Sequence, residues 1–237
     1  MRKINIAVDG HSACGKSSTA RAVAQALGYV YVDSGAMYRA VTYYFLQNNI
    51  SLTNPKEIDH ALSNISIRFF VNSITGIQEI FLNGLRVVDE IREMNVTEKV
   101  SEVSAISAVR EAMVKEQRKI ARKKGVIMDG RDIGSVVLPD AELKIFMTAD
   151  PDVRAERRQK ELFDNDQLVD FEVVKTNLLK RDKMDATRKD SPLVKVDDAE
   201  LIDTTYMTFD EQVDQIINLA TGRMLAKTGI NEKTRQL

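Results

Sequence analysis

The sequence is poor in three features, and each shortage excludes a class of protein. Its one cysteine, Cys14, excludes an internal disulfide framework and fits a reducing compartment. No apolar run approaches membrane-spanning length, and the run after the basic residues 1–3 stops at Asp9, too short for a signal-peptide core. Lys and Arg total 34 against 35 Asp and Glu, so the basic excess typical of a general nucleic-acid binder is missing. We expect a cytoplasmic monomer that engages neither membrane nor nucleic acid.

With 237 residues the chain can bury a substantial core, and we interpret it as one domain with insertions. The short, β-branched run 4–8 ends in Asp-Gly, which predicts a buried strand entering a turn. A helical pattern follows over 17–27, then a second strand over 29–32 and a helix over 37–46. This alternation of strand and helix predicts an α/β fold.

The alternation is then interrupted by a group of short predicted strands. They cover 65–71, 77–82 and 85–88, with Asn83-Gly84 as a hairpin turn, and we interpret them as an insertion. Helices are expected over 105–124, 151–163, 171–188 and 209–225, and strands over 126–128, 143–147 and 200–203. The polar segment 227–237 lacks apolar periodicity, and we expect it to be loose.

The turn after the first strand carries the strongest motif. Gly10, Gly15, Lys16 and Ser17 match G-x-x-x-x-G-K-[ST], in which backbone N–H groups surround phosphates and the lysine reaches the outer ones. The serine hydroxyl would bind magnesium, and the helix N-terminus favours an anion. The alternative is a glycine-rich turn without a ligand. With a strand before it and a helix after it, the motif predicts a nucleoside triphosphate site.

Such a loop alone does not distinguish a phosphotransferase from a GTPase switch or a motor ATPase. No glycine has an aspartate three residues before it and no N-K-x-D occurs, which argues against a switch. Motor ATPases usually carry an acidic pair after an apolar strand, whereas the strand at 126–128 is followed by a single acid, Asp129, then Gly130 and Arg131. The sequence therefore favours a phosphotransferase.

Arginines recur in groups that suit phosphate chemistry. Arginine binds phosphate in a bidentate manner and neutralises charge during phosphoryl transfer. Two groups have helical spacing that puts their members on one face, with solvated, salt-bridged surfaces as the alternative. The groups are Arg154, Arg157 and Arg158, and Arg181, Asp185 and Arg188. Together with the phosphate loop, they predict a site for two phosphate-bearing substrates closed by a basic lid.

Six motifs, in order and spacing, resemble the bacterial cytidylate kinases, a family of P-loop nucleoside monophosphate kinases. They are DGHSACGKSS, YVDSGAMYRA, EIR with VSEVSAISAVR, MDGRDIGSVVLPDAELKIFM, AERR and KRDKMDATRKDSPL. The resemblance covers roughly residues 3–220, and DGRDIG followed by R-D-x-x-D-x-x-R is far more specific than the phosphate loop.

The resemblance implies a single domain over 1–237 with a central parallel sheet in a three-layer P-loop fold. It implies a monophosphate-binding insertion at about 37–105 with a small antiparallel sheet, a lid at about 153–168, and a flexible tail at 226–237. The implied activity transfers the γ-phosphate of ATP, with Mg²⁺, to CMP and dCMP, giving ADP and CDP or dCDP. A sister kinase preferring UMP or AMP, and a binding module that has lost the transfer, are the alternatives.

The resemblance also implies roles for individual residues. ATP would lie on Gly10, His11, Ser12, Ala13, Cys14, Gly15, Lys16, Ser17 and Ser18, of which His11 and Cys14 stand at variable positions. The acceptor would meet Ser34, Ser101, Arg110, Asp132 and Arg188 around its base, Arg39 and Arg131 at its phosphate, and Arg181 and Asp185 at its sugar. Lys16, Arg131, Arg154, Arg157 and Arg158 would be catalytic. Apart from the resemblance, Asp33 and Asp129 end strands near the loop and are expected, with Ser17, to hold magnesium, the aspartates through water; turn capping is the alternative for each aspartate.

Overall fold

A five-stranded parallel sheet forms the centre of the protein. The computed structural model describes residues 2–72, 78–164 and 166–225. The strands lie in the order β2-β6-β1-β7-β8. They are β1 (Asn5–Gly10), β2 (Val30–Asp33), β6 (Val126–Gly130), β7 (Leu143–Thr148) and β8 (Ala199–Asp203). Every pairing is parallel, which confirms the expected α/β fold.

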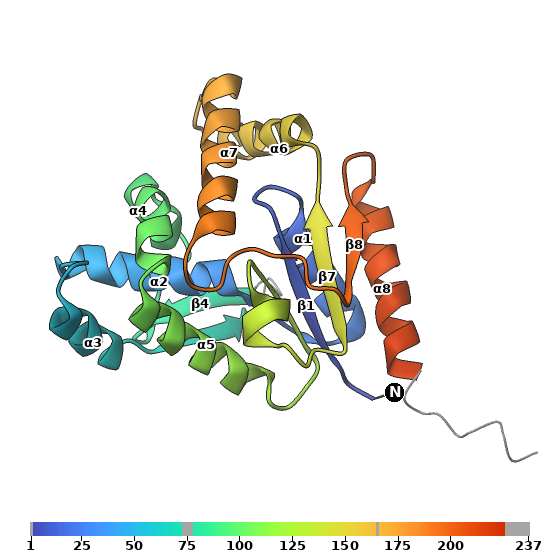
Figure 1. Cartoon of the computed structure of the whole chain (residues 1–237), viewed down its shortest axis with the longest axis horizontal. Helices are drawn as coiled ribbons and strands as arrows, with labels where there is room; N and C mark the ends of the chain where they lie inside the picture. Colours follow the sequence, from blue (N-terminus) through green and yellow to red (C-terminus); the bar gives the residue numbers. More distant parts are fainter. Residues whose placement is uncertain (1, 73–77, 165, 226–237) are drawn as a thin grey trace, which may run out of the picture.

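Helices cover both faces of this sheet. Alternate residues of the central strand β1 point to opposite faces, so the strand contributes side chains to the core on each side. Ile6 and Val8 pack against α1 (Lys16–Leu27) and α8 (Phe209–Leu225), whereas Ala7 belongs to the core beneath α2 (Ser34–Gln47) and α5 (Ser107–Ala121). All six residues of β1 are buried, as expected for a strand covered on both faces. Three layers result (Figure 1).

The insertion extends to one side of the sheet, away from α8 (Figure 1). It holds α3 (Pro55–Ser63), the antiparallel strands β3 (Ile67–Val71), β4 (Gln78–Leu82) and β5 (Leu85–Arg86), the 3₁₀ turn η1 (Glu90–Arg92) and α4 (Met94–Ser104). The predicted hairpin turn is confirmed: Asn83 and Gly84 both have positive φ, 51° and 84°. The start of the predicted strand 77–82 lies outside the described residues.

Two helices of the insertion region were not predicted, although the sequence carries their signals. Asn54 caps α3, its Oδ1 accepting from Lys56 N at 3.2 Å, and Pro55 stands at the first helical position. The buried residues of α4, Val96, Val100 and Val103, follow helical spacing. The helix predicted over 105–124 is shorter in the structure, where it corresponds to α5 (Ser107–Ala121).

The helices α6 (Pro151–Phe163) and α7 (Phe171–Thr187) lie beyond the carboxyl ends of the strands, and they run in different directions (Figure 1). Asp150 caps α6 and Asp170 caps α7. The five-residue π-helical segment η2 (Ile133–Val137) follows β6. Within residues 2–72, 78–164 and 166–225, no helix is long and apolar enough to cross a membrane. The predicted loose tail, 226–237, lies outside the described residues.

Candidate active site

The phosphate loop connects β1 to α1 and depends on two glycines. Gly10 has φ +146°, and a Cβ there would lie 1.9 Å from the carbonyl oxygen of Met147 on β7. Gly15, in the left-handed conformation, is the N-cap of α1 and supplies no side-chain cap. The amino end of α1 therefore keeps backbone N–H groups available for an anion.

Lys16 folds back onto this loop. Its ammonium is buried and donates to the carbonyl oxygen of His11, and it lies 3.6 Å from the Cys14 sulfur. Burial lowers the pKa of Lys16. The Cys14 thiol is fully buried and lies within hydrogen-bonding distance of the carbonyl oxygens of His11, at 3.1 Å, and Met147, at 3.4 Å. Cys14 thus helps to shape the loop and does not present its sulfur to solvent.

Ser17 and Asp129 form the pair best suited to a divalent cation. Ser17 Oγ donates to Asp129 Oδ2 at 2.7 Å, and Tyr31 OH donates to Oδ1 at 2.8 Å. Burial, followed by the negative charge of Asp33, raises the pKa of Asp129 to about 6. No cluster of three or more His, Cys, Asp or Glu suited to a metal occurs among the described residues. A serine and one carboxylate suit Mg²⁺, which typically takes few protein ligands beside phosphates and water.

Asp33 uses both carboxylate oxygens within the protein. Oδ1 accepts from Ala36 N at 2.7 Å and caps α2, and Oδ2 pairs with Arg39 at 3.1 Å. The structure therefore favours the capping alternative for Asp33, with a second role of holding Arg39.

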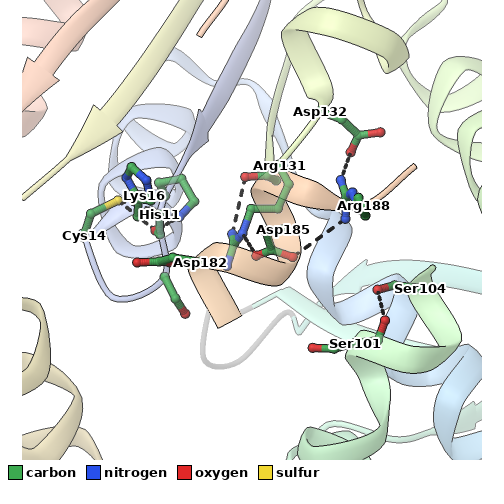
Figure 2. A network of polar contacts seen from close by, with 12 residues as sticks. His11, Cys14, Lys16, Ser101, Ser104, Arg131, Asp132, Asp182, Asp185 and Arg188 are labelled. Atoms are coloured by element: carbon green, nitrogen blue, oxygen red, sulfur yellow. Dashed lines mark hydrogen bonds and ion pairs between the residues drawn. The ribbon is translucent and has the colours of Figure 1, made fainter. Parts of the chain in front are cut away.

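Two of the residues expected around an acceptor base, Arg110 and Arg188, meet at a third, Asp132. Arg110, on α5, donates to Asp132 Oδ2, and both side chains are almost fully buried. Arg188 Nη2 lies 3.7 Å from Asp132 Oδ1 (Figure 2). Arg110 also donates to the carbonyl oxygen of Ser104 at 3.1 Å, which ties it to α4, the helix that carries Ser101. Ser34 Oγ is buried and donates to the Asp129 carbonyl at 2.6 Å.

A second charge cluster lies where α7 meets the loop after β6. Arg131 Nε donates to Asp185 Oδ2 at 2.7 Å, and Arg188 lies 3.8 Å from the other oxygen (Figure 2). Burial, followed by the charge of Arg131, lowers the pKa of Arg181 to about 10. Within the described part of the chain, Nε of Arg39, Nε of Arg181 and Nη2 of Arg188 are buried without hydrogen-bond partners. Such unsatisfied cationic donors suit an anionic ligand.

The three arginines of α6 do not share one role. Arg154 lies against the phosphate loop, donating to the carbonyl oxygens of Ser12 at 3.3 Å and Ala149 at 3.0 Å. Arg157 donates to the Thr204 carbonyl at 2.7 Å, beyond β8. Arg158 is partly exposed and pairs with Glu161 at 2.7 Å. Of the three, Arg154 alone contacts the phosphate loop in the described structure.

Two carboxylates at the site were missed in the sequence. Asp9 accepts from Ile133 N at 2.7 Å and Gly134 N at 2.6 Å, clamping the segment after β6 to the start of the phosphate loop. Burial, opposed by these two hydrogen bonds, raises the pKa of Asp9 to about 6. Asp182 accepts from Arg154 Nη1 at 2.5 Å. Asp9 could have been found as the acid directly before Gly10, and Asp182 as the second residue of the R-D-x-x-D-x-x-R motif.

A phosphate loop at the carboxyl edge of a parallel sheet defines a P-loop protein, and a buried cluster of arginines lies beside the loop. The comparisons give its family. The chain belongs to the cytidylate kinase family, whose model matches residues 6–222.

Two relatives named cytidylate kinase align along nearly the whole chain. The one from Cytophaga hutchinsonii is 58% identical over 225 residues, covering 95% of this chain and 96% of the relative. The one from Bacteroides fragilis is 47% identical over 220 residues, covering 92% and 96%. An uncharacterized protein of solved structure from Eubacterium ventriosum, 14% identical with a TM-score of 0.51, covers 93% of this chain and 99% of its own, and shares the fold.

Proposed function

We propose that the protein transfers the γ-phosphate of ATP to CMP, and to dCMP, giving ADP and CDP or dCDP. One observation carries the proposal beside the family membership: Asp132 is buried between Arg110 and Arg188, next to the arginine cluster around Arg131. A buried carboxylate accepts from the amino group of cytosine, and the two arginines face acceptor atoms of the same base.

The reaction needs no covalent enzyme intermediate and no conventional base. An oxygen of the CMP phosphate is already anionic and attacks the γ-phosphorus directly, so catalysis consists of alignment and dispersal of charge. Arg39, Arg131 and Arg181 hold the acceptor phosphate or sugar. The buried Nε groups of Arg39 and Arg181 have no hydrogen-bond partner among the described residues, and Arg131 and Arg39 repel the charge of Arg181, so an anion between the three is favoured. Lys16 and Arg154 act on the donor phosphates.

Magnesium belongs to the same proposal. Ser17 and Asp129 would hold the ion, with Asp33 behind them, and the ion would supply positive charge against the phosphates. Asp129 must be ionised for this role, and the ammonium of Lys16 nearby favours that state.

Closure restricts the transfer to CMP, because water competes for the γ-phosphate. In this proposal the lid, about 153–168, and the insertion, about 37–105, move when the site closes over its substrates. Arg154 on α6 already touches the phosphate loop, so this end of the lid carries positive charge at the donor site. We further propose that the protein acts as a monomer and that it works in the cytoplasm; its single cysteine fits a reducing compartment.

The decisive experiment compares CMP, dCMP, UMP and AMP side by side as acceptors, with saturating Mg²⁺ and ATP, by measuring ADP and the diphosphate product. CMP and dCMP should exceed UMP and AMP in kcat/KM by about two orders of magnitude or more. A preference for UMP or AMP would identify a sister kinase. Tight binding of ATP and CMP without CDP would identify a binding module, and either result would refute the proposal.

A further inference from the structure

Tyr38 has a buried hydroxyl group that the protein leaves without a partner. The residue lies on α2, its side chain is 7% exposed, and its OH makes no hydrogen bond to any described residue. Burying a hydroxyl unpaired costs about 1–3 kcal/mol, so native proteins rarely do it. The hydroxyl therefore points to a ligand that is part of the working state.

The position of Tyr38 on α2 directs it to the base-binding residues. Ser34 and Tyr38 stand four residues apart and share one face of the helix. Ser34 is bonded to the carbonyl of Asp129, at the start of the segment that carries Asp132. Arg39, the next residue, instead pairs with Asp33. Tyr38 and Arg39, neighbours on one helix, thus face the base end and the phosphate end of a nucleotide.

The ring of Tyr38 is already engaged on one side. The guanidinium carbon of Arg110 lies 5.4 Å from the ring centroid, a cation–π contact that helps to fix the plane of the guanidinium. Arg110 Nε and Arg188 Nη2 are buried without hydrogen-bond partners among the described residues, as is the Tyr38 hydroxyl. The charges of Asp132, Arg110 and Arg188 all act on Tyr38, so three buried donors without partners lie near one carboxylate.

The hydroxyl remains protonated under all ordinary conditions. Burial, followed by the charge of Asp132, raises the pKa of Tyr38 to about 12, with Arg110 and Arg188 acting in the opposite direction. A protonated hydroxyl can donate to a carbonyl or ring nitrogen and can also accept from a ring N–H.

We propose that Tyr38 is a binding and positioning residue for pyrimidine monophosphates: its ring orients Arg110, and its hydroxyl bonds the pyrimidine base. The inference rests on the proposed function, which places a base beside Asp132. Because a hydroxyl bonds N3 whether or not that atom carries hydrogen, Tyr38 strengthens binding of both cytosine and uracil nucleotides. Discrimination between the two stays with Asp132.

Two substitutions separate the hydroxyl from the ring. Tyr38→Phe removes the hydroxyl and keeps the contact with Arg110, whereas Tyr38→Leu removes both. The readouts are calorimetric titration with CMP, with UMP and with ADP plus Mg²⁺, and thermal unfolding without nucleotide. Tyr38→Phe should weaken binding of CMP and UMP about five- to tenfold, the effect of one lost hydrogen bond, and leave ADP within about twofold. Tyr38→Leu should weaken both pyrimidines further.

Stability provides the second readout and Tyr29 the matched control. Tyr38→Phe should unfold at the same temperature as the wild type or a higher one, because the lost hydroxyl had no partner. Tyr29 OH accepts from Ile4 N at 3.0 Å and lies 3.6 Å from Met224 Sδ. Tyr29→Phe should therefore lower the unfolding temperature and leave CMP binding unchanged.

Unchanged CMP affinity in Tyr38→Phe would overturn the proposal, whatever the unfolding temperature of the variant. Wild-type protein that binds a purine monophosphate but no pyrimidine would overturn this inference and the proposed function together. Wild-type protein that binds CMP without forming CDP would refute only the transfer, and the titrations would still decide the role of Tyr38.

Discussion

Asp182 on α7 accepts a hydrogen bond from Arg154 on α6 at 2.5 Å, and both side chains are largely buried. Arg154 also touches Ser12 of the phosphate loop, while the residue before Asp182, Arg181, belongs to the cluster with Arg131. The helix α7 therefore contacts the donor side through Asp182 and the acceptor side through Arg181. Because Asp182 uses Nη1 of Arg154, the other terminal nitrogen stays available for a phosphate oxygen.

Replacing Asp182 by asparagine should misplace Arg154 without touching the acceptor site. We expect kcat to fall about ten- to a hundredfold, with KM for CMP within about twofold. In an Arg154→Met background the same change should have little further effect, because residues that act as a pair are not additive. Glu116→Gln, which breaks an exposed pair with Lys119, is the control. Additive losses in the double variant would show that Asp182 acts independently of Arg154.

Lys16→Ala should separate donor from acceptor binding. The substitution removes the positive charge from the outer phosphates, so transfer should fall by about three orders of magnitude or more. CMP should bind with unchanged affinity, because Lys16 makes no contact with the residues around Asp132. The exposed Lys56→Ala on α3 controls for a general loss of charge. Turnover near that of the wild type would refute the assignment of the phosphate loop.

Asp132→Asn should lower the use of CMP and narrow its advantage over UMP, since an amide can rotate to donate where the carboxylate only accepts. Arg188→Met should lower the use of both, because cytosine and uracil share the O2 acceptor. The measurement is the ratio of kcat/KM for CMP to that for UMP. This ratio is insensitive to the fraction folded, which matters because Arg110 and Arg188 lose their buried partner. An unchanged ratio would show that the carboxylate does not read the base and only orients its arginines.

Asp9 should make stability depend on pH. Its pKa is about 6 in the folded protein against 3.8 for the ordinary side chain, so the folded state holds the proton more tightly. The contribution of this raised pKa to the free energy of unfolding is fully present below pH 4. It is lost as pH rises through 6, and the loss is on the order of 3 kcal/mol.

Urea denaturation of the wild type and of Asp9→Asn between pH 4 and 7 measures this effect. The stability of the wild type relative to the variant should decline across that range, and Asp129, present in both proteins, cancels in the difference. A difference that does not change with pH would mean that the carboxyl of Asp9 is ionised throughout.

Features encoded over a few neighbouring residues were determined by the sequence itself. The phosphate loop needs glycine at positive φ and a lysine one residue later, and the apolar periods of β1, α1, α6 and α8 are local. The cap of α3 at Asn54 and Pro55 was equally readable and was overlooked. These elements were predictable because dihedral preference and side-chain period act within one or two turns of chain.

The tertiary structure alone decided which of these residues meet. Asp9 reaches Ile133 because β1 and β6 are adjacent, and Asp182 reaches Arg154 because α6 and α7 pack side by side. The same packing assigned different partners to three arginines that the helical period had grouped, and it buried Cys14, whose exposure no local signal determines. Such contacts join residues far apart in the chain, and their geometry depends on how whole helices lie on the parallel sheet, which no short stretch of sequence specifies.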